Sequence, residues 1–191
     1  GGDGTLLEGI HRLDGCDIPV VGLNSGRLGF LALAQSSEVD DVFEQIANNS
    51  LKIERRAMLA VSGKLDGKNQ TIYALNEVAV QRLGASMISV DVSIDSLPTL
   101  TCNGDGIIIS TPTGSTAYSL SAGGPIVAPA CCCLILTPLS PHNLTLRPVV
   151  APDSSTINLK IRTRSNEASI SVDNRTFAVA DNEEIEVKIS K

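Results

Sequence analysis

The first 50 residues contain two stretches in which apolar residues recur at every third or fourth position. This spacing predicts helices over residues 6–13 and 38–48. The first helix follows a glycine-rich turn at residues 1–5, and a short apolar run at residues 18–22 predicts a strand between the two helices. We expect the back half of a parallel α/β domain, because this stretch is too short to close a sheet alone.

Beyond residue 50 the pattern changes toward alternation of apolar and polar residues, which is the period of a half-buried strand. Strands are predicted at residues 51–55, 58–65, 71–81, 90–94, 107–110, 157–161 and 185–189. Residues 66–69, Asp-Gly-Lys-Asn, have the composition of a hairpin turn. The fold class is therefore α/β followed by all-β, with an α/β domain over residues 1–50 and a mostly antiparallel β domain over residues 51–191.

Composition narrows the class of protein further. The 191 residues are 42% hydrophobic and carry a net charge of -6, which excludes intrinsic disorder and argues against binding to nucleic acid. The longest nearly apolar run, residues 126–136, is far shorter than the roughly 20 residues that span a bilayer. We expect no membrane association, no signal peptide and a cytoplasmic location.

The five cysteines suggest neither a disulfide framework nor a metal site. Their number is odd, and Cys131, Cys132 and Cys133 are consecutive. The two histidines, His11 and His142, do not stand at zinc-like spacing from them. We predict no metal site built from protein side chains, and we interpret the cysteine run as the buried start of a strand.

The glycine-rich turn at residues 1–5, Gly-Gly-Asp-Gly-Thr, is the first candidate for chemistry. Closely spaced backbone N–H groups at a helix N-terminus suit a phosphate, and glycines let a polyphosphate approach the backbone. The charge of Asp3 would repel phosphate, so this carboxylate suits a base that takes a proton from an attacking hydroxyl, or a metal ligand. A tight turn in which Asp3 is a local cap explains the pattern equally well.

The second candidate is residues 111–125, in which almost every residue is small or carries a hydroxyl group. Such a segment offers convergent hydrogen-bond donors, and Tyr118 offers a surface on which a purine can stack. A polar connector with Tyr118 packed into the core is the alternative. We favour a ligand-binding loop, because ordinary connectors rarely have this composition.

The third candidate is the pair Asn76 and Glu77, which interrupts an apolar run at residues 72–80. Successive side chains of a strand point to opposite faces, so one of the pair points inward unless the strand ends there. An inward polar group needs a partner, and ribose hydroxyls would supply one. If the strand ends at this point, both side chains are solvated. His142 follows Ser-Pro on a predicted loop, where it suits either a phosphate or a structural hydrogen bond.

Together these residues resemble the NAD kinase family. The family's motifs occur in the family's order and at its spacing, at residues 1–5, 76–77, 104–125 and 137–148. The GGDG loop alone is not specific, since diacylglycerol and sphingosine kinases and phosphofructokinases carry similar loops. The segment TPTGSTAYSLSAGGP is much more specific.

The resemblance implies a Rossmann-like α/β domain, of which this chain would hold the C-terminal part, followed by a β-sandwich domain. It implies transfer of the γ-phosphoryl group of ATP to the adenosine ribose 2′-hydroxyl of NAD, giving NADP, with a divalent metal such as Mg²⁺ or Mn²⁺. It also implies a homodimer or homotetramer. We expect the chain to lack the first part of the α/β domain and a C-terminal segment that relatives have.

The resemblance also assigns roles to individual residues. Asp3 would be the base that orients and deprotonates the 2′-hydroxyl, and Asp105 would approach the nicotinamide end of NAD. The other candidates would bind the substrates: Gly1, Gly2, Gly4 and Thr5 the polyphosphate, Asn76 and Glu77 the adenosine, Thr116, Ala117 and Tyr118 the adenine, and Thr113, Ser121 and His142 further parts of the site.

Two rival interpretations stay open. A lipid kinase of the same superfamily would share the GGDG loop and would need a hydrophobic acceptor groove. A non-catalytic NAD(P)-binding fragment is the second. The chain also departs from the family at Asn174, where relatives usually have glycine, and asparagine tolerates the left-handed φ that such a turn needs.

Overall fold

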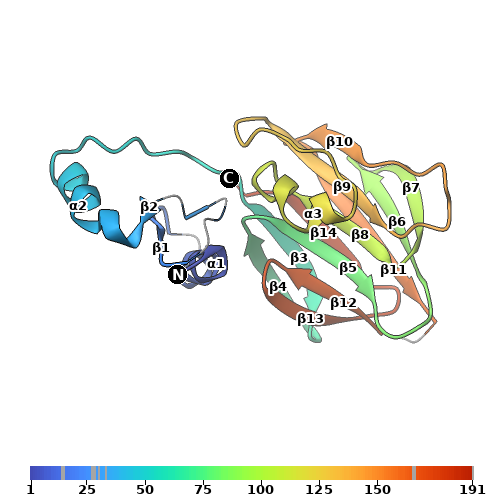
Figure 1. The fold of residues 1–191 in the computed structure, drawn as a ribbon. Helices are drawn as coiled ribbons and strands as arrows, with labels where there is room; N and C mark the ends of the chain where they lie inside the picture. The colour runs from blue at the N-terminus through green and yellow to red at the C-terminus, as the bar shows by residue number, and fades with distance from the viewer. Residues whose placement is uncertain (14–15, 27–28, 30, 33, 165–166, 191) are drawn as a thin grey trace. The chain divides into compact units, whose positions relative to one another are not determined.

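The computed structural model describes residues 1–13, 16–26, 29, 31–32, 34–164 and 167–190. The chain divides into two compact units, Gly1–Arg55 and Arg56–Lys191 (Figure 1). Within the described residues, no helix is long and apolar enough to cross a membrane.

The first unit contains two helices and a pair of short strands. Its elements are α1 (Asp3–Arg12), β1 (Leu23–Asn24), β2 (Ala34–Gln35), the 3₁₀ helix η1 (Ser36–Glu38) and α2 (Val39–Ala47). The strands pair in parallel, and both predicted helices are confirmed. Parallel pairing with helices on either side along the chain is the arrangement expected of an α/β domain.

Two predicted strands do not form. Residues 18–22 have no regular structure, and Ile18, Val20 and Val21 are about half exposed. Residues 51–55 are likewise irregular and lie at the boundary between the units. An apolar run becomes a strand only where a neighbouring strand accepts its backbone hydrogen bonds, and the described residues provide no such neighbour for either run.

The second unit is a sandwich of two six-stranded sheets. The β5 sheet has the order β10-β9-β8-β5-β12-β13, and the β3 sheet has the order β4-β3-β14-β11-β6-β7. Every pairing in both sheets is antiparallel. The strands are β3 (Leu59–Leu65), β4 (Lys68–Ala74), β5 (Glu77–Arg82), β6 (Ile88–Ile94), β7 (Leu97–Gly104), β8 (Gly106–Ser110), β9 (Cys133–Leu139), β10 (Val149–Pro152), β11 (Ile157–Thr163), β12 (Glu167–Val172), β13 (Arg175–Ala180) and β14 (Glu184–Ile189).

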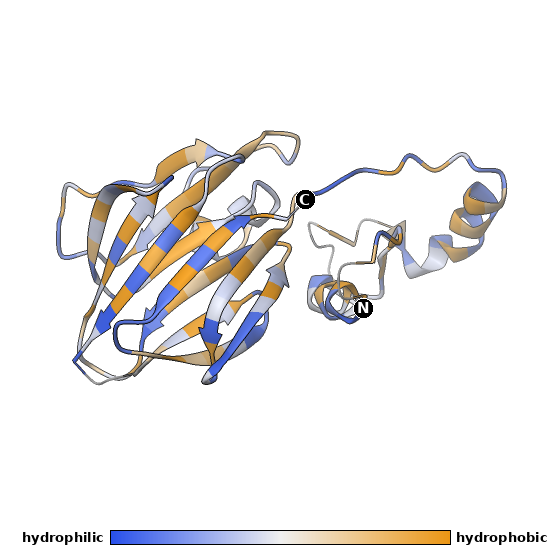
Figure 2. Cartoon of the chain, turned by 180° about the vertical axis from the view of Figure 1, so that it is seen from behind, coloured by the Kyte–Doolittle hydropathy of each residue, from blue (hydrophilic) through white to orange (hydrophobic). Residues whose placement is uncertain are grey.

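The alternation in the sequence places one face of each sheet in a common core. Apolar bands alternate with polar ones along the strands of the β3 sheet, as Figure 2 shows from behind. The core is made of aliphatic residues from both sheets, among them Leu59, Val78, Val80, Val90, Ile107, Ile109, Leu136, Leu159, Ile170 and Val187. Burial of these side chains is the main stabilising contribution to the fold.

The predicted strand over residues 71–81 is wrong in one respect. The run is two strands, β4 and β5, which belong to different sheets and are separated by Leu75 and Asn76. Both halves are apolar because each faces the same core, so the hydrophobic pattern does not reveal the break between them. The pair Asn76–Glu77 therefore lies at the turn between the two sheets.

The interpretation of the cysteine run as a buried strand start is also wrong. Cys131 and Cys132 are exposed, and β9 begins only at the half-buried Cys133. The Cys131 N–H donates to the carbonyl oxygen of Ala128 at 2.9 Å, so the run belongs to a turn before the strand. All five cysteines, each of which lies in the described residues, have free thiols.

The core predicts the cost of truncating a central strand. Ile109 of β8 is fully buried between β5 and β9, so Ile109→Ala should lower the free energy of unfolding by about 2–5 kcal/mol. Urea denaturation measures the effect. In the matched control Leu97→Ala, which truncates a side chain that is 71% exposed, the change should stay within about 0.5 kcal/mol. Equal effects in the two variants would contradict this assignment of the core.

Candidate functional site

Glu77 begins β5 and lies on the outer face of the β5 sheet. Val78 and Val80 point into the core, so the alternation of the strand turns Glu77, Ala79 and Gln81 the other way. Glu77 is nevertheless only 9% exposed. Both alternatives for this pair are therefore partly right: the preceding strand ends here, but Glu77 is buried rather than solvated.

The pKa of Glu77 differs from its ordinary value. Burial, reinforced by the negative charge of Asp173, raises the pKa of Glu77 to about 7, although a hydrogen bond with the backbone of Tyr118 acts in the opposite direction. Its Oε2 atom is buried without a hydrogen-bond partner in the described structure, and so is Oγ of Ser110, which is the cross-strand neighbour of Glu77. Unpaired polar atoms inside a protein are costly, so these two mark a place where a ligand hydroxyl or a water would be stabilising.

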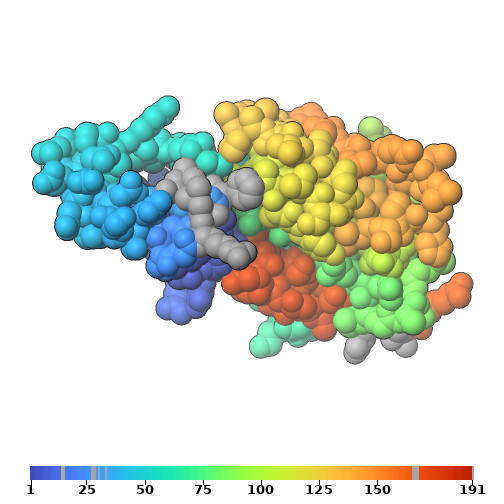
Figure 3. Space-filling view, in the orientation of Figure 1, coloured from blue at the N-terminus to red at the C-terminus, as the bar shows by residue number. Residues whose placement is uncertain are grey.

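The segment at residues 111–125 covers this part of the sheet. It contains the 3₁₀ helix η2 (Thr113–Thr116) and the short helix α3 (Tyr118–Ser121), and it lies over the β5 sheet as the yellow surface in Figure 3. Ala122 packs against the small apolar cluster of Ala79, Ile108 and Leu139 on the outer face of the sheet. The segment thus forms a second layer above Glu77.

Tyr118 is at the surface of this layer rather than in the core. Its side chain is 39% exposed, and Nε2 of Gln81 donates to its hydroxyl at 2.7 Å. Thr116 and Ala117 beside it are half-buried, and Ser121 is exposed. The ring is therefore available for stacking, and its hydroxyl is oriented by the same strand that carries Glu77.

Several hydroxyl groups of the segment serve the protein's own structure. Ser115 Oγ bonds to the backbone N–H and carbonyl of Val127 at 3.1 Å, and Ser119 bonds to Thr137 at 2.9 Å. Arg56 donates to Oγ1 of Thr113 at 3.3 Å, and Thr113 is buried. The sequence analysis thus overestimated the number of hydroxyl groups available to a ligand, because the buried hydroxyls hold the segment in place.

Asp105 and His142 are not brought to the Asn76–Glu77 turn. Nε of Arg82 donates to Asp105 at 2.5 Å, and this hydrogen bond holds the pKa of Asp105 below its ordinary value. Arg82 and Glu77 are opposite ends of β5, and five strand steps separate them by about 17 Å. The exposed His142 donates its backbone N–H to Asn103 at 2.8 Å, near Asp105. These residues form a second cluster at the far end of the strand.

In the first unit, the glycine-rich turn leads into α1 as predicted. Gly2 is the N-cap residue, and Asp3 is the first helical residue. Oδ1 of Asp3 accepts the N–H groups of Leu31 and Ala32, both at 3.2 Å, so Asp3 binds a distant loop of the same unit. Among the described residues, nothing lies within 4 Å of the position that a Cβ atom would take on Gly2 or Gly4, and Thr5 next to them is exposed.

The described side chains do not form a metal site by themselves. Residues 1–13, 16–26, 29, 31–32, 34–164 and 167–190 contain no group of three or more His, Cys, Asp or Glu side chains that could hold a metal ion. Mg²⁺, however, is commonly bound by one or two carboxylates together with substrate phosphates. Asp3 at the glycine-rich turn fits that mode.

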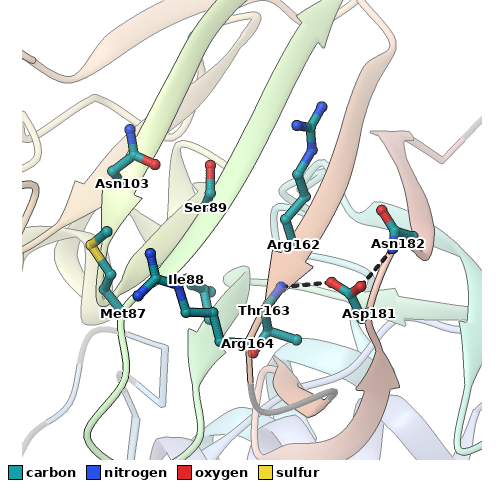
Figure 4. Close-up of a pocket in the computed structure, with 9 residues that line it drawn as sticks. All are labelled: Met87, Ile88, Ser89, Asn103, Arg162, Thr163, Arg164, Asp181 and Asn182. Atoms are coloured by element: carbon teal, nitrogen blue, oxygen red, sulfur yellow. Dashed lines mark hydrogen bonds between the residues drawn. The ribbon is translucent and has the colours of Figure 1, made fainter.

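The β sandwich also forms an open hollow of about 380 Å³, shown in Figure 4. None of the predicted site residues lines it. Its lining residues come from one end of the β3 sheet and the turn before β14, where Asp181 accepts the N–H of Thr163 at 2.7 Å: Met87, Ile88, Ser89, Asn103, Arg162, Thr163, Arg164, Asp181 and Asn182. The shape of the surface alone therefore does not locate the candidate site.

The family is decided by sequence models of its two domains. Residues 75–191 match the ATP-NAD kinase C-terminal domain, and residues 1–51 match the ATP-NAD kinase N-terminal domain. The chain belongs to the NAD kinase family. It is 41% identical to the NAD kinase of Christiangramia forsetii over 191 residues, which is 98% of this chain and 65% of that protein. It is 43% identical to the NAD kinase of Sulfurimonas denitrificans over 174 residues, with 91% and 61% covered.

Solved structures of the family have the same fold. Yeast NADH kinase complexed with NADH superposes with a TM-score of 0.94 at 32% identity, over 100% of this chain and 56% of the yeast chain. An NAD kinase from Archaeoglobus fulgidus in complex with ATP gives a TM-score of 0.86 at 31% identity, over 100% of this chain and 72% of the other. The expected fold, an α/β domain followed by a β-sandwich, is confirmed, and the chain spans about two thirds or less of the length of the curated relatives named here.

Three residues of the site escaped the sequence analysis: Ser110, Gln81 and Asp173. Each looks ordinary in the sequence, because a serine at a strand end, a glutamine on a strand and an aspartate in a hairpin turn are all common. The period of β5 would have placed Gln81 on the same face as Glu77. No local signal points to Asp173.

The raised pKa of Glu77 makes protein stability depend on pH. Since Glu77 is protonated more readily in the folded state than in the unfolded state, its contribution to stability is present at low pH and is lost as pH rises from about 4.5 to about 7. Glu77→Gln, which cannot ionise, should therefore gain stability relative to wild type across this range, and the difference should level off above it. Urea denaturation at a series of pH values measures the difference.

A matched control replaces an exposed carboxylate on the same sandwich. Glu184 is 69% exposed, so the difference between Glu184→Gln and wild type should not show the rise expected for Glu77→Gln. A difference for Glu77→Gln that stays constant from pH 4.5 to 7 would contradict the raised pKa.

Proposed function

We propose that this protein is an NAD kinase, which transfers the γ-phosphoryl group of ATP to the 2′-hydroxyl of the adenosine ribose of NAD. The observation that carries the proposal is the buried Glu77, whose Oε2 has no partner in the described structure and which lies beside Asn76 and under Tyr118. A ribose supplies the hydroxyl donor that this oxygen lacks, and the adenine attached to it supplies a partner for an exposed aromatic ring. Relatives of the same family have been solved with NADH and with ATP.

The residues of the second unit would bind the adenosine part of NAD. Asn76 and Glu77 would bond to the ribose, and Thr116, Ala117 and Tyr118 would line the adenine, as the family resemblance assigns. Thr113 and Ser121 stay proposed contacts, and the hydroxyl of Thr113 also accepts a hydrogen bond from Arg56. Because a carboxyl group with a pKa near 7 is about half protonated at neutral pH, Glu77 can donate as well as accept a hydrogen bond there.

Asp3 would act on the reacting hydroxyl. It would accept the proton of the 2′-hydroxyl while the ribose oxygen forms its bond to the γ-phosphorus and the bond from that phosphorus to ADP breaks. An aspartate with an ordinary pKa of about 3.9 is a weak base, so positioning and charge neutralisation must supply most of the acceleration. Gly1, Gly2, Gly4 and Thr5 would let the polyphosphate approach the backbone at the start of α1.

A divalent cation, Mg²⁺ or Mn²⁺, belongs to the proposed reaction as the partner of the ATP phosphates. When bound, it would neutralise negative charge on the phosphoryl group in transfer. Because Asp3 is assigned as the base, the nucleotide phosphates and water would supply the ligands of this cation.

We also propose a homodimer or homotetramer in the cytoplasm, without nucleic-acid or membrane partners. In such an oligomer, Asp105 and His142, which lie away from the Asn76–Glu77 turn, would serve the site of another copy, with Asp105 toward the nicotinamide end. Size-exclusion chromatography with light scattering tests the oligomer. A monomer at micromolar concentration would contradict it.

One assay separates the proposed activity from its alternatives. The protein is incubated with ATP, Mg²⁺ and NAD, and NADP is measured with an NADP-specific dehydrogenase, with diacylglycerol as a second acceptor and EDTA as the metal control. NADP formation that EDTA abolishes supports the kinase. Lipid phosphate would instead indicate the lipid kinase, which the relatives named above disfavour, and NAD binding without product would indicate a non-catalytic module.

The role of Asp3 predicts a separation of binding from turnover. Asp3→Asn keeps the shape of the side chain but removes the proton acceptor, so kcat should fall by roughly 10²–10⁴-fold while NAD affinity stays close to wild type. Steady-state kinetics and isothermal titration calorimetry with NAD measure the two quantities. Asp40→Asn on α2, an exposed acidic residue of a first helical turn, is the matched control and should be fully active. A kcat near wild type for Asp3→Asn would rule out its role as the base.

A further inference from the structure

The turn that carries Asn76 and Glu77 is held by a residue almost one hundred positions away. The N–H of Leu75 donates to Oδ2 of Asp173 at 2.8 Å, and the N–H groups of Asn76 and Glu77 donate to Oδ1 at 2.9 and 3.1 Å. Three consecutive amides therefore converge on one carboxylate. Hydrogen bonds to a charged acceptor are stronger than neutral ones, so this arrangement fixes the backbone of the turn firmly.

Strand pairing brings Asp173 to this place. β12 pairs with β5 so that Val172 lies opposite Val78, and the next residue, Asp173, donates its own N–H to the carbonyl of Glu77 at 2.9 Å. Asp173 has φ of 50°, in the left-handed region that aspartate tolerates better than most residues. Asn174, which the sequence analysis expected to hold the left-handed position, does not have a positive φ.

The other side of the turn is held by the segment at residues 111–125. The N–H of Thr111 donates to the carbonyl of Asn76 at 2.9 Å, and its hydroxyl donates to the carbonyl of Leu75 at 2.7 Å. Gly114 lies so close to Asn76 that a Cβ atom there would collide with the Asn76 backbone. The carbonyl groups of Leu75 and Asn76 thus accept hydrogen bonds from Thr111, and the N–H groups of the turn donate to Asp173.

The carboxylate oxygens of Asp173 bind the protein backbone and are not proposed to contact a ligand directly. Both are engaged by backbone N–H groups, so the carboxylate acts on a ligand through Asn76 and Glu77. Its negative charge also favours the protonated form of Glu77, since it contributes to the raised pKa of that group. Asp173 therefore influences both the position and the protonation state of Glu77, which is proposed to bind the ribose.

We propose that Asp173 is a positioning residue of the nucleotide site, which fixes the Asn76–Glu77 turn in the conformation that binds the ribose of NAD. This inference rests on the proposed function. It adds a residue from outside the motif segments to the machinery of the site. The hairpin between β12 and β13 is, on this basis, a functional element of the NAD site and not only a connection of two strands.

Asp95 offers a matched control for removal of the carboxylate. It occupies the turn between β6 and β7 with φ of 51°, donates its N–H to the carbonyl of Thr156 at 2.9 Å, and accepts the Thr156 N–H at 2.8 Å and the Ser155 hydroxyl at 3.0 Å. Asp95→Ala therefore removes a similar carboxylate from a similar turn of the other sheet. It leaves the Asn76–Glu77 turn untouched.

Two measurements on the ligand-free and the NAD-titrated protein test the proposal. Amide hydrogen exchange of Leu75, Asn76 and Glu77 should become at least about tenfold faster in Asp173→Ala, since the loss of one charge-assisted hydrogen bond corresponds to roughly 10–100-fold in an equilibrium constant. The NAD dissociation constant should rise by about the same factor. Asp173→Asn, which keeps one acceptor oxygen, should recover part of both losses, and it serves as the test variant if Asp173→Ala does not fold.

Asp95→Ala should leave both quantities within about twofold of wild type, because distant sites act independently. Unchanged NAD affinity in both Asp173 variants would overturn the proposal, as would an equal loss of affinity in Asp95→Ala. Unchanged hydrogen exchange of the three amides would show that Asp173 does not fix the backbone of the turn. If the wild-type protein does not bind NAD, the proposed function is wrong, and NAD is not the ligand of this turn. The hydrogen-exchange measurement still decides in that case whether Asp173 fixes the turn.

Discussion

The pairing of β5 with β8 on one side and β12 on the other is the interaction on which the candidate site depends. Its register turns Val78 and Val80 into the core and turns Glu77 and Gln81 outward, beneath the segment that carries Tyr118. A slip of one residue would exchange the two faces and bury the charged group inside the sandwich. The stability of the core therefore fixes the orientation of the site.

The net charge of -6 is no obstacle to binding two anionic nucleotides. The residues proposed to bind the nucleotides include the amide of Asn76, the exposed hydroxyl of Ser121 and the backbone of the glycine-rich turn, so the local chemistry differs from the average of the surface. At the proposed ribose site, burial and the neighbouring Asp173 favour the neutral form of Glu77, which lowers the negative charge that a nucleotide would meet. The overall charge of a chain therefore does not describe the local chemistry of a site.

Much of the fold followed from periodicity, and the failures have a common physical cause. Both helices and the strands β3, β4, β5, β6, β8, β11 and β14 were predicted, because each has an apolar face at a regular spacing. The strands β7, β10, β12 and β13 were not predicted. The runs at 18–22 and 51–55 have the same apolar character but no pairing partner in the described residues, and the break at Leu75–Asn76 lacks glycine or proline. Among the predicted site residues, Asn76, Glu77 and Tyr118 lie together in the structure. Asp105 instead forms an ion pair with Arg82, at the opposite end of β5 from Glu77.

The sequence by itself determined the class of fold, the family and the residues on which the chemistry should depend, because local spacing and the motifs are encoded in neighbouring positions. Only the tertiary structure decided which hydroxyls are used up in holding the segment at 111–125, that Glu77 is buried with an unpaired oxygen, and that Asp173 holds its turn. These properties arise from burial and from contacts between residues as many as 98 positions apart. No local pattern carries that information, because it exists only once the strands have paired.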